Sequence, residues 1–439
     1  MSHKIKAGAS VVNITPEKSH FLYGYPYVER MSTGVHDELQ ATALFLSDNH
    51  TEILFVSLDI IYVTKETVSR IRKAVTTKTG IPGSHILIAA THTHSAPVTA
   101  EMIISSKDPV VPRIDQNYLR FLEESTIIAA CRAVEKAEKA EIGFVKGDAT
   151  GVGTNRHDPA GPKDMDVPAL LVRSRNNETI ACMLICNMHP TILHEDSTLY
   201  SSDFPHYTRK NLRQHLGERC SVLYFTGTAG NQSPRHVTQS NTFGEAERIG
   251  KIVSDAIISR LEEHVAYSDN APITARQALV NLPTRNFPSV VWAKRNRDDK
   301  KKLFEELRNS SATSQQIRTA EVNWFGSEEL LLLSTLVESN GLESIYDTIL
   351  PAEIQIVKIG DHALIAWPGE VFVEYGLELK KHFNNVSLIT YANGELQGYL
   401  VTKEANEKGF YESGNALFDH TAGERMTETT MELLKELGQ

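Results

Sequence analysis

Apolar runs and helical repeats alternate along the first part of the chain. The continuous apolar run at 53–58 is typical of a strand that is covered on both faces. Thr64 is a suitable N-cap, apolar residues then recur at helical spacing, and Gly80 followed by Pro82 ends the predicted helix. The next apolar run, at 86–90, completes a strand, helix, strand unit. Such a unit predicts a right-handed crossover between two parallel strands.

The same alternation continues to about residue 225. An amphipathic helix is predicted over 117–139, and its charged end should face water. A loop rich in Gly, Pro and Asp follows at 149–165. The runs at 169–172 and 180–186 predict a hairpin of buried strands, and 221–225 predicts another strand. Each of these strands ends in a polar loop, which is where open α/β sheets build their functional sites.

The pattern changes between about 287 and 343, where the sequence is charged and helical and has no strand signal. Strands are predicted again at 352–359 and 363–367, followed by a Pro-Gly-Glu turn. We therefore expect one α/β domain over residues 1–439. Its predicted architecture is a central mixed, largely parallel sheet flanked by helices, with a helical insertion or lid at 287–343.

Composition narrows the possible functions of the chain. The formal net charge of -10 argues against nucleic acid as a partner, because phosphate binding needs a basic surface. No apolar run is long enough for an integral membrane segment, and the N-terminus lacks the apolar core of a signal peptide, so we expect a cytoplasmic protein. Four cysteines are too few for a disulfide framework in 439 residues and are expected to be buried as small apolar side chains.

Histidines and acidic residues follow several of the predicted strands. The run at 86–90 leads into Thr-His-Thr-His, and in an extended strand His92 and His94 would project from the same side. An isolated His-x-His could equally be a pair of surface residues. Two histidines and a carboxylate are nevertheless a common set of zinc ligands, and zinc lowers the pKa of a bound water to about 7. The other candidates at strand ends are His189, His194, Asp203, His206, His236 and Glu370.

A series of motifs in a fixed order adds more than any one of them. They are TGVHDELQATALFL with VSLD after it, ATHTHSAP, GTNRHDP, NMHPTIL followed by SSD, FTGTAGNQSP, AWPGE, and GYLVTKEANEKGFYESGNALF. With these motifs the sequence resembles the neutral ceramidases, zinc amidases that cleave N-acylsphingosine into sphingosine and a fatty acid. The resemblance covers essentially the whole chain and is to the catalytic N-terminal domain of the longer family members.

The resemblance implies a zinc site and the residues around it. The implied zinc ligands are His92, His189, Glu370 and Tyr399. The residues implied to act on the substrate are His94, Arg156 and Tyr411. Tyr411 follows Tyr399 by twelve residues, the separation that the family has. Ser233 matches a serine considered as a nucleophile in the family, but its turn is not of the G-x-S-x-G kind, so we expect a positioning hydroxyl.

The implied reaction is hydrolysis of an N-acyl bond by attack of a zinc-bound water, which releases an amine and a carboxylic acid. His94 would transfer the proton, while Arg156 and Tyr411 would stabilise the oxyanion. Ala96 and Asn231 depart from the family pattern, so a soluble N-acyl amine is as suitable a small-molecule substrate as ceramide. A metal-dependent esterase or phosphoesterase, and a noncatalytic ligand-binding protein, are the alternatives.

Four polar residues near the motifs are expected to play other parts. His36 and His194 are interpreted as solvated or core histidines. Asp203 and His206 are expected to cap the following helix or to line the pocket. The sequence does not indicate an oligomeric state or an acyl-chain preference.

Overall fold

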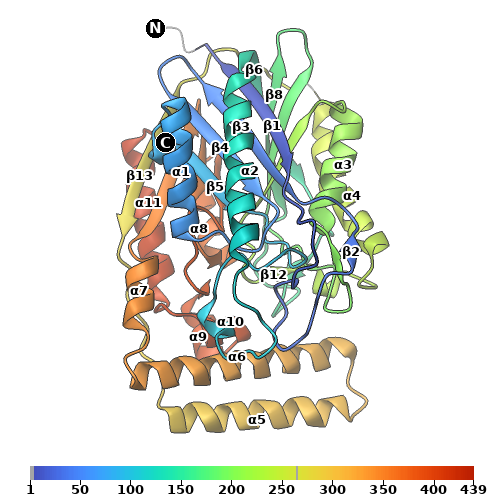
Figure 1. The fold of residues 1–439 in the computed structure, drawn as a ribbon, viewed down its shortest axis with the longest axis vertical. Helices are drawn as coiled ribbons and strands as arrows, with labels where there is room; N and C mark the ends of the chain where they lie inside the picture. The colour runs from blue at the N-terminus through green and yellow to red at the C-terminus, as the bar shows by residue number, and fades with distance from the viewer. Residues whose placement is uncertain (1–3, 264) are drawn as a thin grey trace.

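Two β-sheets pack face to face between layers of helices in the computed structural model, which describes residues 4–263 and 265–439 (Figure 1). The larger sheet has the strand order β11-β9-β8-β6-β1-β3-β4-β5, and the smaller has the order β13-β14-β15-β17. The strands of the larger sheet are β1 (Lys6–Asn13), β3 (Gln40–Ser47), β4 (Glu52–Leu58), β5 (Ile86–Ala90), β6 (Glu138–Asp148), β8 (Asp166–Ser174), β9 (Thr179–Cys186) and β11 (Ser221–Thr226). Those of the smaller sheet are β13 (Ile273–Val280), β14 (Ala352–Ile359), β15 (His362–Ala366) and β17 (Val386–Ile389).

The larger sheet is apolar on both faces. In β4, Leu54 and Val56 pack toward the helices, whereas Ile53 and Phe55 lie in a cluster that includes Val357 of the smaller sheet. Successive side chains of a strand point to opposite faces, so a continuous apolar run is needed wherever both faces are covered. The prediction of buried strands at 53–58, 86–90 and 221–225 is therefore confirmed.

Helices cover the outer face of each sheet. On the larger sheet they are α1 (Lys65–Thr79) and α2 (Gln116–Glu135) over one half and α3 (Phe204–Leu216) and α4 (Phe243–Leu261) over the other. On the smaller sheet they are α8 (Val373–His382) and α11 (Thr421–Glu436). As predicted, the hydroxyl of Thr64 accepts a hydrogen bond from Thr67 N at the start of α1, and Gly80 ends this helix with φ 81°.

Two sequence predictions about the fold need correction. The mixed α/β sheet flanked by helices is confirmed, but among the described strands of the larger sheet only β4–β5 and β9–β11 pair in parallel. The apolar runs correctly indicated that both faces of the sheet are covered. One face is covered by the second sheet, so the strands need not be joined by helical crossovers that would make them parallel. The helix predicted over 117–139 ends at Glu135, and 138–148 forms β6 because Ala140 and Ile142 alternate into the core.

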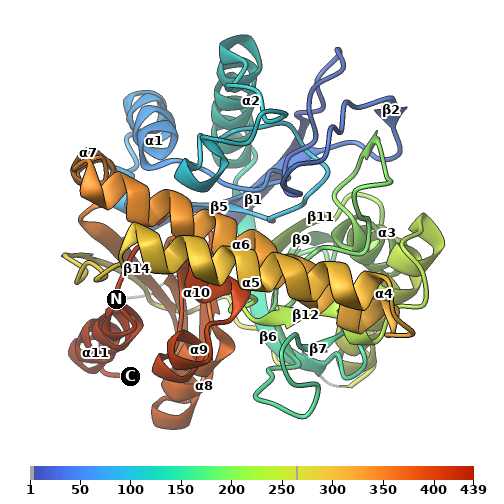
Figure 2. The ribbon, with the colours of Figure 1, turned by 90° about the horizontal axis from the view of Figure 1, so that it is seen from below.

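The charged region near 300 forms two long antiparallel helices, α5 (Val290–Arg308) and α6 (Ser314–Glu338), followed by the short α7 (Glu343–Ile349). Figures 1 and 2 show α5 and α6 side by side across one end of the molecule. α6 crosses α10 (Tyr411–Asn415) closely, because a Cβ placed on Gly414 would lie 2.2 Å from the carbonyl oxygen of Gly326. The predicted helices are present, and the division of the chain into one domain with a lid remains a prediction.

Four short strands lie at the same end of the sheets. β7 (Thr154–Asn155) pairs with β12 (Gln232–Ser233), and β16 (Glu370–Val371) pairs in parallel with β18 (Tyr399–Leu400). Helix α9 (Lys403–Lys408) leads from β18 to α10.

The two edges of the larger sheet approach each other although β5 and β11 are seven places apart in its strand order. The hydroxyl of Thr226, at the end of β11, donates to the carbonyl oxygen of Thr91, just after β5, at 2.7 Å. The segment after β17 bonds to both edges, because Ala90 N donates to Tyr391 O at 3.1 Å and Thr390 N donates to Thr226 O at 2.9 Å. The carboxyl ends of strands from both sheets therefore meet in one place.

Two expectations from composition can be compared with this fold. Cys182, Cys186 and Cys220 are buried free thiols, as predicted, and Cys131 is a half-buried one. Across the described ranges, no helix combines the length and the apolar character that crossing a membrane requires.

Candidate metal centre

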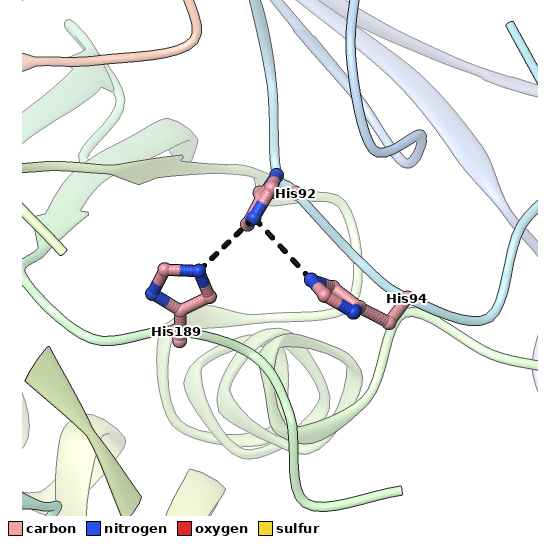
Figure 3. A group of neighbouring side chains, drawn as sticks. All are labelled: His92, His94 and His189. Atoms are coloured by element: carbon pink, nitrogen blue, oxygen red, sulfur yellow. Dashed lines mark hydrogen bonds between the residues drawn. The ribbon is translucent and has the colours of Figure 1, made fainter. Parts of the chain in front are cut away.

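Three histidines converge where the strand ends meet. His92 and His94 follow β5, and His189 follows β9; Figure 3 shows their rings pointing toward one another. The Nε2 atom of His92 lies 3.1 Å from Nε2 of His189 and 3.3 Å from Nε2 of His94. His92 and His189 are each 1% exposed. These three side chains form a group that could bind a metal ion.

His92 and His94 reach the same side for a different reason from the one the sequence had indicated. Strand β5 ends at Ala90, and His92 has a φ of 66°, in the left-handed region that a strand does not use. The imidazoles of His92 and His94 meet edge to face with centroids 4.9 Å apart. The convergence was predicted correctly, but a sharp turn produces it and the alternation of a strand does not.

The Nδ1 atom of each imidazole lies against a backbone carbonyl oxygen. A carbonyl oxygen can only accept a hydrogen bond, so each Nδ1 carries the proton, and a neutral ring then presents a lone pair at Nε2. Three lone pairs cannot hydrogen-bond to one another, but they suit a cation placed among them. The three carbonyl oxygens belong to Ile61, Gly24 and Ala229, at 2.9, 3.0 and 2.6 Å from Nδ1 of His92, His94 and His189, respectively.

A buried carboxylate completes this arrangement. Oε2 of Glu370, the first residue of β16, lies 3.2 Å from Nε2 of His189 and 3.5 Å from Nε2 of His92. Tyr62 donates a hydrogen bond to Oε1, and the hydroxyl of Tyr391 donates to Oε2 at 3.5 Å. Burial alone would raise the pKa of Glu370, whereas positive charge at His92 and His189 holds that pKa well below its usual value. A cation bound among neutral imidazoles would supply the same positive charge. Imidazole nitrogens with a carboxylate oxygen are the donors that zinc binds in catalytic sites.

Burial favours the uncharged forms of His94, His189, Tyr399 and Tyr411. It lowers the pKa of His189 to about 4, helped by the positive charge of Arg156, and it lowers that of His94 well below its usual value. Burial raises the pKa of Tyr399, whose backbone pairs with Glu370, and that of Tyr411 well above their usual values. Neutral imidazoles are ready to bind a metal, whereas a tyrosine becomes a good ligand only when a nearby cation favours loss of its proton.

Arg156 lies beside the centre with part of its hydrogen-bonding capacity unused. Its Nη1 donates to Glu412 Oε1 at 3.1 Å, and Glu412 Oε2 is 2.8 Å from Nε2 of His157. The Nε of Arg156 is buried and has no hydrogen-bond partner within residues 4–263 and 265–439. The ring of Tyr411 lies 6.1 Å, between centroids, from that of Tyr399. The guanidinium and the phenols therefore line the same space as the histidines.

The other candidate residues from the sequence are not members of the histidine group. The Ser233 hydroxyl accepts a hydrogen bond from Arg235 N at 3.2 Å and caps the short helix Pro234–His236. Asp203 caps α3, as predicted, by accepting from Phe204 N at 2.6 Å. His36 and His206 both face Asp37, at 3.1 and 3.5 Å. His194 lies against Tyr25, and Nε2 of His236 is 3.2 Å from Arg156 O.

Sequence reasoning did not predict three residues of the centre, Tyr62, Tyr391 and Glu412. The two tyrosines hydrogen-bond to Glu370, and the ring of Tyr391 stacks on that of His92 at 4.0 Å. Tyr62 follows β4 and Tyr391 follows β17, so the strand-end argument would have found both had it not been restricted to histidines and acids. Glu412 is adjacent to the predicted Tyr411, but nothing in the sequence indicates that it pairs with Arg156.

A Gly24→Ala substitution is expected to displace His94 and to leave His92, His189 and Glu370 in place. Gly24 has φ 130°, and a Cβ there would lie 2.4 Å from Nδ1 of His94, which is bonded to the Gly24 carbonyl. A misplacement of about 1 Å in a catalytic group can lower turnover by about 100-fold. We expect a loss of that order in kcat with unchanged metal content, measured by initial rates and elemental analysis. Gly80→Ala is the control. Gly80 also has a positive φ, so the substitution causes similar backbone strain, but a Cβ at this position would have no atom within 4 Å apart from those of its chain neighbours. Equal activity in both variants would contradict the role of Gly24.

Residues 6–218 match the family described as neutral/alkaline non-lysosomal ceramidase, N-terminal. The resemblance to the neutral ceramidases is confirmed. Two similar solved structures are the neutral ceramidase from Pseudomonas aeruginosa, at 16% identity and TM-score 0.77, and a ceramidase complexed with C2, at 14% identity and TM-score 0.74. The first alignment covers 98% of this chain and 74% of the other, and the second covers 97% and 74%. None of the curated protein sequences matches the chain.

The family match covers only some of the residues of the centre. The family match contains His92, His94, Arg156 and His189. It ends before Ser233, Glu370, Tyr399 and Tyr411. At 14–16% identity the structural likeness shows that the ceramidase fold extends over the whole chain. The contacts in the structure therefore carry the argument for the later residues.

Proposed function

We propose that this chain is a zinc-dependent hydrolase of linear amide C–N bonds. It cleaves ceramide or another N-acyl amine and releases an amine and a carboxylic acid. The observation that carries the proposal is the set of three imidazoles, each with its proton fixed at Nδ1, whose Nε2 lone pairs face one another beside the carboxylate of Glu370. The ceramidase family match and fold support the choice of an amide as the bond that is cleaved.

The proposed zinc ligands come from four separate segments of the chain. They are His92, His189, Glu370 and Tyr399. A zinc ion bound there would supply a water of lowered pKa and would polarise the scissile carbonyl. His92 and His189 are oriented by the carbonyl oxygens that accept from their Nδ1 atoms, and Tyr62 and Tyr391 orient Glu370.

The neighbouring residues would bind and activate the substrate. His94 holds its proton at Nδ1 against Gly24, so its Nε2 is free to take a proton from the attacking water and to give it to the leaving nitrogen. Arg156 and Tyr411 are donors available to the oxygen that becomes negative in the transition state. Such a donor contributes on the order of 100-fold to turnover. Glu412 holds Arg156 in place through the contact with its Nη1.

Metal analysis together with amine release would test the proposal. We expect purified protein to contain about one zinc per chain, to release amine from N-acyl amines that include N-acylsphingosine, and to lose this activity on chelation. Re-addition of zinc to the chelated protein is the control for irreversible damage. Absence of bound metal would contradict the site. Cleavage of matched esters or phosphate monoesters, with no cleavage of the amides, would contradict the reaction.

A further inference from the structure

A positively charged side chain beside the centre forms no ion pair with any of the described residues. Arg235 lies in the short helix Pro234–His236, immediately after Ser233, and is half-buried. In the described part of the chain, no hydrogen bond or ion pair reaches its guanidinium group. A guanidinium has five N–H donors, and none of those of Arg235 is among the buried side-chain atoms that lack a partner, so they remain accessible to a bound molecule. The fold therefore leaves Arg235 available to a bound molecule.

The surroundings of Arg235 increase this deficit of negative charge. Burial, together with the positive charges of Arg156 and Arg318, lowers the pKa of Arg235 to about 10. Both neighbours have carboxylates of their own. Arg156 contacts Glu412 at 3.1 Å, and Arg318 of α6 contacts Glu195 at 3.0 Å and Glu321 at 2.7 Å. Glu412 also acts on Arg235 and raises its pKa, but this carboxylate is paired with Arg156, and among the described residues no acid contacts the Arg235 guanidinium.

Backbone pairing places Arg235 next to the reacting groups. β12 pairs with β7, Arg156 N donates to Asn231 O at 2.8 Å, and Nε2 of His236 is 3.2 Å from Arg156 O. Arg235 thus lies between two residues whose hydrogen bonds attach this segment to that of Arg156. The backbone of Arg235 is therefore adjacent to that of Arg156, and the positive charge of Arg156 acts on the Arg235 guanidinium.

A series of ring and charge contacts extends from the histidine group to α6. The ring of Tyr25 lies 5.3 Å from that of His94 and 5.9 Å from that of His194, and the Arg318 guanidinium is 6.0 Å from its centroid. The charges of Arg318 and Arg235 both act on His194. Tyr25, Arg318 and His194 therefore link the histidine group to the neighbourhood of Arg235.

The positive charge of Arg235 favours an anionic substrate over a neutral one. The planar fork of a guanidinium matches a carboxylate through two parallel hydrogen bonds. A neutral N-acyl amine such as ceramide offers no charge to compensate Arg235. The carboxylate that forms on hydrolysis belongs to the product, so it cannot contribute to the choice of substrate.

We propose that the substrate is an N-acyl compound that carries a carboxylate, such as an N-acyl amino acid, and that Arg235 binds this carboxylate. The inference rests on the proposed amide hydrolysis and names the substrate class of the same site. Arg235 is a specificity-determining residue in this role and takes no part in bond cleavage.

Matched substrates would measure the preference for a carboxylate. The first pair is N-octanoylglycine and its neutral counterpart N-octanoylglycinamide. The second is the mono-hexylamide of adipic acid and its methyl ester, which places the charge on the acyl side. We expect wild-type protein to favour the charged member of one pair by about 30-fold or more in kcat/KM, and Arg235→Gln to remove that preference mainly through KM. Arg235→Lys should restore part of it, because a lysine keeps the charge and loses the fork.

Arg219→Gln is the matched control, since the Arg219 side chain is 87% exposed and should leave the ratio unchanged. Equal ratios in wild type and Arg235→Gln would overturn the inference while amide hydrolysis stands.

A second measurement does not depend on turnover: calorimetric binding of N-octanoylglycine and of N-octanoylglycinamide to metal-free protein. Tighter binding of the acid that is lost in Arg235→Gln supports the carboxylate site even if no amide is cleaved. Equal binding of acid and amide, or tighter binding of octyl phosphate than of N-octanoylglycine, would overturn it.

Discussion

His92→Ala and Glu370→Ala proteins are expected to lose their bound metal and nearly all amide hydrolysis. Each substitution removes one donor from a centre whose other donors are fixed by backbone carbonyls and tyrosine hydroxyls. With the metal lost, kcat/KM should fall by roughly 1,000-fold or more, because the activated water and the polarised carbonyl are lost together. Elemental analysis and initial rates on the same preparations would measure both effects. Unchanged metal content in both variants would refute the proposed ligand set.

His94→Ala separates the two possible donor sets of this centre. The three histidines lie close enough together to bind a metal ion, whereas the proposed set uses Glu370 and Tyr399 in place of His94. If His94 acts on the substrate, the variant should keep its metal and lose about 100-fold or more in kcat. Loss of the metal would instead make His94 a ligand. His215→Ala, at an exposed position of α3, is the control and should change neither quantity.

Asp59→Ala is expected to cause a large loss of stability. Asp59 is completely buried and holds the guanidinium of Arg209 at two points, with Nη1 to Oδ1 at 3.0 Å and Nη2 to Oδ2 at 2.7 Å. Its carboxylate also accepts from Thr91 Oγ1 and Gln40 N. Removal of one partner leaves a buried charge without compensation, which costs about 3–5 kcal/mol in the free energy of unfolding. Urea unfolding of both proteins would measure the difference.

The surface pair of Asp255 and Lys251 provides the comparison for this experiment. These two side chains lie one turn apart on α4 at 2.7 Å, and both are more than half exposed. Asp255→Ala should therefore change the free energy of unfolding by less than about 0.5 kcal/mol. A similarly small change for Asp59→Ala would show that the buried pair does not stabilise the fold. Since Thr91 precedes His92, weaker metal binding by Asp59→Ala is expected as well.

The local elements were more predictable from sequence than their arrangement. The caps at Thr64 and Gly80 bound α1 as predicted, because capping depends on residues a few positions apart. The run at 53–58 indicated that both faces of β4 are covered, but an apolar side chain does not specify whether a helix or a second sheet covers it. β13 was not predicted, since it lies at the edge of the smaller sheet and most of its side chains are not buried.

The candidate centre was predictable where short motifs carry it. His92 and His189 end two apolar runs, so both could be recognised before any partner was known. Their facing Nε2 atoms depend on a left-handed residue at His92 and on carbonyl oxygens from Ile61 and Ala229. Those acceptors are backbone atoms, which every residue has, so no residue type marks them in the sequence. The unpaired state of Arg235 likewise results from what the fold does not place beside it.

The meeting of the two sheet edges has a consequence for how the protein acquires its centre. The hydrogen bond between Tyr62 and Glu370 joins residues 308 positions apart, and the segment after β17 bonds to both β5 and β11. Contacts between such distant parts of a chain form slowly, because a large loop must close before they stabilise anything. The proposed metal donors are therefore expected to converge late in folding, after the last strands have docked, so that metal binding would require the nearly complete fold.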